Sequence, residues 1–125
     1  SSSLVELVDL YPTLAELCGF EVPEGLAGKS LEPVLDDPAT TVRDAALTQV
    51  GRRGRAAAPD GPYTGYSIRT DRYRYTEWGD GEYGAELYDH ASDPGEYQNL
   101  ADDPAHGETR AEMRRLLSTA RHRGG

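Results

Sequence analysis

Side chains that could act as nucleophiles, acid–base groups or metal ligands are few and scattered in this 125-residue sequence. The single cysteine, Cys18, lies on the apolar side of a predicted short helix, and we expect it to be a small core residue. The adjacent acids Asp36-Asp37 and Asp102-Asp103 each precede a proline, which favours solvated loops or helix caps over metal ligands. The histidines have neither metal-ligand spacing nor a neighbouring nucleophile-elbow motif; they are His90, His106 and His122.

The charge pattern that points to a function is a block of arginines between two acidic segments. Residues 51–75 contain six arginines and two aspartates, whereas residues 1–50 have a net charge of −7 and residues 76–104 a net charge of −9. Residues 51–62 have neither strand nor helix period, so we predict a long loop. Three arginines of this loop suit bidentate binding of sulfate or carboxylate oxygens, the alternative being that they pair with nearby acids. They are Arg52, Arg53 and Arg55.

Composition limits the chain to one modest domain of 13.6 kDa with a formal net charge of −9. A charge this negative argues against general nucleic-acid binding, which needs a basic surface. No apolar run is long enough to span a membrane, and no signal peptide is visible. The chain begins without methionine and enters an apolar run almost at once. We therefore expect the tail of a longer protein, and the sequence gives no localisation.

The first third of the chain is predicted to be a short helix followed by loop. Residues 3–8 are expected to be extended or irregular, and residues 10–18 to be helical, because Asp9 can cap the first turn and Gly19 can end the last. Residues 19–43 are rich in glycine, proline and acids, which predicts loop with one helical turn. A strand is predicted over residues 45–50.

The rest of the chain predicts a small sheet and a terminal helix. Residues 66–70 and 72–78 alternate in type and are rich in β-branched and aromatic side chains, which favours two strands joined by a tight turn at Asp71. A third strand is expected over residues 85–89. A final helix is expected to begin near Pro104, and one face of it is apolar. The arginines of the strands are expected to pair within the sheet; they are Arg69, Arg72 and Arg74.

Residues 86–101 read Glu-Leu-Tyr-Asp-His-Ala-Ser-Asp-Pro-Gly-Glu-Tyr-Gln-Asn-Leu-Ala. This run resembles the C-terminal signature of the sulfatase family: Glu-Leu-Tyr-Asp, three variable residues, Asp-Pro-x-Glu, two more, then Asn-Leu. Residues 9–14 with Gly19 resemble the helix after the family's last catalytic segment, and residues 28–31 resemble its linker. Residues 65–78 are most similar to the iduronate-2-sulfatase-like branch.

The resemblance implies an α+β fold, in which a small antiparallel sheet and a C-terminal helix form the C-terminal subdomain of an alkaline-phosphatase-like α/β sulfatase. Residues 1–20 would then end the large catalytic domain. Residues 21–62 would form a linker, a short strand and the arginine-rich loop, and residues 63–125 the subdomain. The implied activity is hydrolysis of sulfate esters, with a sulfated small molecule or glycan as substrate.

The family's chemistry uses a formylglycine, made within a Cys/Ser-x-Pro-x-Arg motif, and a calcium ion held by oxygen ligands. This chain lacks both. Neither proline nor arginine follows Cys18 at the required positions, and Ser92 is followed by proline but has Glu96 where arginine is needed. We therefore expect no catalytic residue, metal ligand or cofactor in this chain, and expect calcium and formylglycine in a catalytic domain upstream.

Two functional interpretations follow. In the first, the chain supports the active site of a sulfatase, the arginine-rich loop lines the cleft, and apolar residues near the N-terminus pack against the catalytic domain. The chain alone would then be inactive. In the alternative, the chain is a stand-alone anion-binding or interaction module that uses the Arg52–Arg55 loop. A Cys/Ser-x-Pro-x-Arg motif encoded upstream of Ser1 would favour the first.

Overall fold

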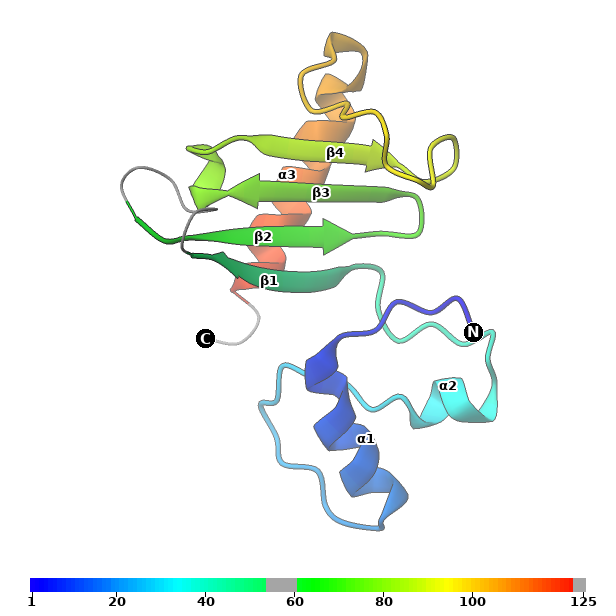
Figure 1. The fold of residues 1–125 in the computed structure, drawn as a ribbon. Helices are drawn as coiled ribbons and strands as arrows, with labels where there is room; N and C mark the ends of the chain where they lie inside the picture. The colour runs from blue at the N-terminus through cyan, green and yellow to red at the C-terminus, as the bar shows by residue number, and fades with distance from the viewer. Residues whose placement is uncertain (54–60, 123–125) are drawn as a thin grey trace.

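A computed structural model describes residues 1–53 and 61–122, which form two parts (Figure 1). The first part is an N-terminal segment of residues 1–44, which contains the short helices. The second is a four-stranded sheet backed by a long helix near the C-terminus. Among the described residues, no helix is long and apolar enough to cross a membrane.

The sheet is antiparallel throughout and its strands follow chain order. They are β1 (Ala46–Arg52), β2 (Tyr63–Arg69), β3 (Tyr73–Trp78) and β4 (Ala85–Asp89). The 3-10 turn η3 (Gly79–Gly81) lies between β3 and β4, and the turn η4 (Pro104–His106) leads into helix α3 (Gly107–Arg121). The predicted fold class, a small antiparallel sheet with a C-terminal helix, is confirmed.

The hydrophobic core lies between α3 and one face of the sheet. Strand alternation directs Ile68, Tyr75 and Leu87 towards the helix, and each is at most 1% exposed. The helix contributes Met113 and Leu117, both on its predicted apolar stripe. The core is small, so each of these side chains carries a large share of the buried apolar surface.

The segment after β4 covers the outer edge of that strand. The side-chain Oδ1 of Asn99 accepts hydrogen bonds from the backbone N–H groups of Leu87 and Ala101, and its Nδ2 donates to the carbonyl of Ala85. The backbone N–H of Leu100 also donates to the carbonyl of Leu87. An edge strand that would otherwise expose unpaired backbone groups is thereby satisfied.

The N-terminal segment contains the 3-10 turn η1 (Leu7–Asp9) and the helices α1 (Leu10–Leu17) and α2 (Glu32–Asp36). Helix α1 ends as predicted, because Gly19 has φ +73° and so adopts the left-handed region that glycine enters without strain. The single helical turn expected within residues 19–43 is α2.

Three details differ from the sequence prediction. Asp9 makes no side-chain cap to α1; its carboxylate is fully buried and binds groups far away in the sequence. Cys18 is exposed rather than in a core. The loop predicted to begin at residue 51 begins later, because β1 continues to Arg52, and β2 begins at Tyr63 rather than at Tyr66. Residues 54–60 of that predicted loop lie outside the described residues. The boundaries proposed at residues 20 and 62 stay predictions.

Candidate functional site

The face of the sheet opposite α3, which we call the outer face, carries arginines and aromatic rings. Antiparallel register places Arg52 of β1 directly opposite Tyr63 of β2, and Gly65 of β2 directly opposite Trp78 of β3. Because Tyr63 and Gly65 are two residues apart on one strand, all four positions share this face. The end of the sheet nearest the β1–β2 connection is therefore both basic and aromatic.

Trp78 is held in one orientation by three neighbours. Its indole N–H donates to Glu86 Oε1 at 2.9 Å, and the Tyr63 ring meets it edge-on with centroids 6.0 Å apart. A Cβ atom on Gly65 would overlap the indole ring, so glycine at this position is what lets the ring lie flat on β2. Tyr63 itself packs against Tyr83, with ring centroids 4.6 Å apart and the planes tilted by 37°.

Arg52 lies over this ring, with its Cζ 4.5 Å from the Trp78 centroid. A guanidinium stacked on an aromatic face keeps its N–H edge available for hydrogen bonding. Arg52 and Arg53 are both exposed and border a hollow of about 410 Å³, together with Pro62, Tyr63 and Thr64. Within the described parts of the chain, neither arginine has a carboxylate partner. The third predicted arginine, Arg55, lies outside the described residues.

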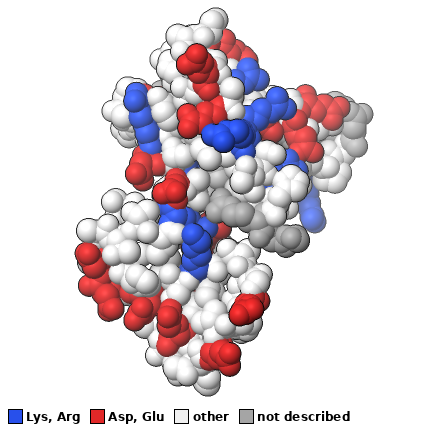
Figure 2. Space-filling view, turned by 180° about the vertical axis from the view of Figure 1, so that it is seen from behind, with Lys and Arg blue, Asp and Glu red and all other residues white. Residues whose placement is uncertain are grey.

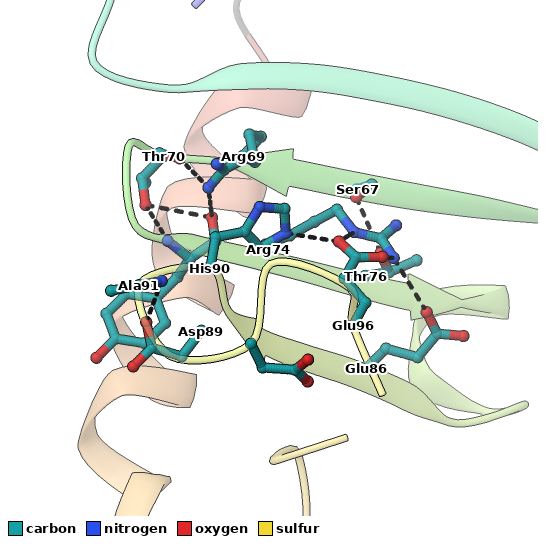
Figure 3. A network of polar contacts seen from close by, with 12 residues as sticks. Ser67, Arg69, Thr70, Arg74, Thr76, Glu86, Asp89, His90, Ala91 and Glu96 are labelled. Atoms are coloured by element: carbon teal, nitrogen blue, oxygen red, sulfur yellow. Dashed lines mark hydrogen bonds and ion pairs between the residues drawn. The ribbon is translucent and has the colours of Figure 1, made fainter. Parts of the chain in front are cut away.

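Further along the outer face, the Asp-Pro-Gly-Glu motif is tied to β3 (Figure 3). Arg74 forms a two-pronged ion pair with the carboxylate of Glu96, and His90 Nε2 lies 2.6 Å from Glu96 Oε1. The Arg74 guanidinium lowers the pKa of the Glu96 carboxyl, and the hydrogen bond from His90 acts in the same direction.

These contacts account for the motif without a chemical role. Glu96 has a φ of +56°, an unfavourable backbone conformation for a residue with a side chain, and its ion pair with Arg74 fixes it there. Asp93 accepts hydrogen bonds from the backbone N–H groups of Glu96 and Gln98. The Asp-Pro-Gly-Glu part of the sulfatase-like run thus folds back onto the sheet and closes it at β4.

The remaining strand arginines also pair close to the sheet. Arg72 forms a two-pronged ion pair with Asp89, and this hydrogen bonding lowers the pKa of the Asp89 carboxyl to about 2. Arg69 donates to backbone carbonyls of the β2–β3 turn. The prediction that these arginines pair within the sheet is confirmed for Arg72, whose partner lies in β4, whereas Arg74 pairs mainly with Glu96 after β4 and Arg69 binds backbone carbonyls.

The N-terminal segment is joined to the sheet by a buried ionic group, which we call the Arg43 cluster: Glu6, Asp9 and Arg43. The Arg43 side chain is 1% exposed and pairs with both carboxylates. Asp9 also accepts the backbone N–H of Lys29 at 2.8 Å, and Glu6 accepts that of Leu47 in β1 at 2.7 Å. The cluster therefore fixes η1 against the start of the sheet.

The surface around this cluster is apolar and open to solvent. Leu7 is 87% exposed, Leu14 61% and Phe20 70%, although such side chains normally lie inside a protein. Other large apolar side chains of the same segment are also exposed; they are Val5, Val8, Leu10, Tyr11 and Leu17. Around this segment Figure 2 shows acidic groups at the margins and few basic ones. Exposed apolar side chains gathered on one segment in this way are typical of an interaction site.

The described residues do not fit the family's metal or nucleophile. Among residues 1–53 and 61–122, no three His, Cys, Asp or Glu side chains gather where they could hold one ion. Asp103 caps η4 through the N–H of Ala105, and His106 Nδ1 lies 3.1 Å from its carboxylate. Cys18 has no neighbouring motif for conversion to formylglycine.

The aromatic cluster of Tyr63, Trp78 and Tyr83 is not predicted by the sequence as part of a site. Its signal in the sequence is the placement of Gly65 and Trp78 on adjacent strands, where a large ring can occupy the space that glycine leaves. That signal can be recognised only when the pairing register of β2 and β3 is known. The sequence does predict Arg52, but as a loop residue rather than as the last residue of a strand.

Comparison with known proteins places these features in a family. Residues 1–123 match the model of the C-terminal region of N-sulphoglucosamine sulphohydrolase. The chain is 36% identical over 124 residues to a Δ4,5-hexuronate-2-O-sulfatase from Bacteroides thetaiotaomicron, covering 88% of this chain and 22% of that protein. It is 34% identical over 109 residues to arylsulfatase K from Gallus gallus, covering 80% of this chain and 19% of that protein.

Solved structures give the same result. A 2-O GAG sulfatase has a TM-score of 0.76 at 36% identity, with 93% of this chain and 24% of that chain covered. A second structure, solved with its substrate D-glucosamine-2-N,6-O-disulfate, has a TM-score of 0.71 at 27% identity, with 92% and 23% covered. The chain thus spans about a quarter or less of the proteins it matches.

These matches confirm the predicted sulfatase resemblance, and a hexuronate sulfatase among the relatives agrees with the iduronate-2-sulfatase-like branch. The two relatives are each about four times as long as this chain. The chain belongs to the sulfatase family, in which it corresponds to the C-terminal domain.

Proposed function

We propose that this chain is the C-terminal domain of an enzyme that hydrolyses sulfate esters of sugars. The observation that carries the proposal is the match of residues 1–123 to the C-terminal region of a sugar sulfohydrolase. Relatives named for a hexuronate 2-O-sulfate and for a glucosamine disulfate substrate support sugars as the substrate class. Sulfuric ester hydrolysis itself would occur in the catalytic domain that precedes this one.

The domain's part in that enzyme is to pack against the catalytic domain and support the active site. The exposed apolar side chains of η1 and α1 supply the packing surface, because burying several of them would stabilise the contact by roughly 1.5–3 kcal/mol each. The Arg43 cluster holds this surface at a fixed orientation to the sheet. If α1 packs against the catalytic domain, movement of α1 would therefore move the outer face of the sheet with it.

The test uses the longer protein and the 125-residue chain side by side. Sulfate release would be measured, with calcium present, from a 2-O-sulfated unsaturated hexuronate disaccharide, from glucosamine 6-sulfate and from an aryl sulfate. The longer protein is expected to release sulfate from at least one sugar, and the chain alone from none. A variant lacking the Cys or Ser of the upstream Cys/Ser-x-Pro-x-Arg motif should lose the activity.

Two results would contradict the proposal. Turnover by the purified 125-residue chain would show that the missing machinery is not needed. A longer protein without the Cys/Ser-x-Pro-x-Arg motif, or one that cleaves none of the three substrates, would favour the alternative of an anion-binding module.

A further inference from the structure

We propose that Arg52, Arg53 and Tyr63 form a binding site for a sulfated sugar on this chain itself, with Trp78 as the support that positions Arg52. The site rests on the proposed function for its ligand class, but it concerns binding by the residues of this domain rather than hydrolysis. The arginines bind the anionic group of the sugar, and the sugar ring lies in the hollow beside them.

Arg52 is held in place, and none of the described residues accepts a hydrogen bond from its guanidinium. Its guanidinium stacks on Trp78 at 4.5 Å. The indole is in turn fixed by its hydrogen bond to Glu86 and by the space that Gly65 leaves for the ring. Because the stack restricts the rotamers of a long side chain, less conformational entropy is lost when an anion binds. The arginine is thus arranged in advance for a two-pronged contact with sulfate.

Arg52 also differs in its charge environment from Arg72 and Arg74. The guanidinium of Arg72 pairs with the carboxylate of Asp89, and that of Arg74 pairs with Glu96, so both positive charges are neutralised. Arg52 stacks on an uncharged ring instead, and no described carboxylate lies within ion-pair distance of it. In a chain with a net charge of −9, two adjacent arginines that no described carboxylate neutralises are a local reversal of sign.

The hollow beside the arginines has the size and lining of a small-ligand site. Its volume of about 410 Å³ falls within the range of about 300–1,000 Å³ common for such sites. Tyr63 and Pro62 provide apolar surface against which the C–H groups of a sugar ring can pack, while Thr64 and the backbone of Gly51 offer polar atoms. A free inorganic anion would use the arginines but not the ring surface.

Binding would be measured by titration calorimetry of the 125-residue chain with D-glucosamine-2-N,6-O-disulfate. Fluorescence offers a second readout, since Trp78 is the single tryptophan of the chain and touches Arg52. Unsulfated glucosamine tests binding of the sugar ring in the hollow, and inorganic sulfate tests binding of the anion by the arginines. We expect saturable binding of the disulfate with a change in emission, and at least tenfold weaker binding of either control compound.

Variants then assign the contacts. Arg52→Gln is expected to weaken disulfate binding about tenfold and Arg53→Ala severalfold. Tyr63→Leu is expected to weaken binding of the disulfate severalfold and of inorganic sulfate by less, since Tyr63 affects sulfate only indirectly, through Trp78 and Arg52. Arg115→Gln is the matched control, because it removes one exposed arginine from α3 on the other side of the sheet. Circular dichroism confirms that each variant is folded.

Equal affinity in Arg52→Gln and the unaltered chain would overturn the assignment, as would equal binding of inorganic sulfate and the disulfate. The proposed function stands or falls separately. A longer protein that cleaves sulfated sugars while the chain binds none refutes only this site, and a chain that binds while the longer protein is inactive refutes only the enzymatic proposal.

Discussion

The two parts of this chain bury opposite kinds of side chain. In the sheet and α3, apolar groups such as Ile68 and Leu117 form the interior and most charged groups lie outside. In the N-terminal segment, the fully buried carboxylate of Asp9 and the guanidinium of Arg43 are inside, and leucines and Phe20 are outside. We expect the first arrangement to be stable in water by itself. We expect the second to need another surface that covers the leucines.

The difference also indicates which kind of interaction keeps each part in place. Hydrophobic burial stabilises the sheet and helix without demanding one orientation, whereas an ion pair with hydrogen bonds at both carboxylates is directional. We infer that the Arg43 cluster serves to set the angle of α1 relative to the sheet. The substitutions below separate the two parts, beginning with the largest expected effect.

Breaking the Arg43 cluster should detach the N-terminal segment while the sheet stays folded. Arg43→Ala leaves the fully buried Asp9 and the partly buried Glu6 without their cation, a change that typically costs about 3–5 kcal/mol. Hydrogen exchange should show amides of residues 10–17 opening with a free energy lower by that amount, while amides of β2 and β3 change little. Arg115→Ala is the control, and a uniform loss of protection in both parts would contradict the division.

Creating a cavity in the other part should have the converse effect. Leu117→Ala removes a side chain that is 1% exposed and should lower the free energy of unfolding of the sheet and α3 by about 2–5 kcal/mol. Urea denaturation followed by the fluorescence of Trp78 measures it. Leu116→Ala, at a half-buried position of the same helix, should cost clearly less. Equal losses at the two leucines would argue against a core centred on Leu117.

Acid should weaken the sheet through Asp89. Because its pKa is about 2 when folded against an ordinary value of 3.8, the folded state binds a proton less readily than the unfolded state. Its contribution to stability is therefore complete above about pH 4 and is lost as the pH falls towards 2. The Tm difference between the unaltered chain and Asp89→Asn should shrink over that window; a constant difference would contradict the Arg72–Asp89 pair.

The smallest effect on stability is expected at the exposed leucines of α1. Leu10→Ser with Leu14→Ser should change the free energy of unfolding by about 0.5 kcal/mol or less each, because both side chains are more than half exposed. The same change should abolish self-association, which we expect of the unaltered chain at high concentration. Sedimentation velocity measures this, with Val50→Ser in β1 as control. A chain that is monomeric without the substitutions would count against an open docking surface.

How far the sequence predicts this molecule depends on the range of the interactions involved. Strands β2, β3 and β4 follow from alternation over five to seven residues, and α3 from its apolar stripe, because both patterns are local. The end of β1 could not be predicted, since Gly51 and Arg52 have no strand-like character. They are in a strand because Thr64 and Tyr63 lie opposite them.

Contacts between distant parts of the chain explain the errors at Asp9 and Cys18. An aspartate before a helix is usually its cap, but Asp9 binds Arg43, which lies 34 residues further along the chain. A cysteine on an apolar helix face is usually buried, but Cys18 is exposed, on the segment that we propose packs against the catalytic domain. Likewise the stacking of Arg52 on Trp78 depends on a register across three strands.

The most direct test of the contrast between the two parts is hydrogen–deuterium exchange of residues 7–20, measured in the 125-residue chain and in the longer protein under the same conditions. If η1 and α1 pack against a sulfatase catalytic domain, their amides will exchange at least tenfold more slowly in the longer protein, while those of β2 and β3 exchange at similar rates in both. Equal exchange of residues 7–20 in the two proteins would contradict the docking surface and, with it, the proposed role of the N-terminal segment in holding the domain to the catalytic domain.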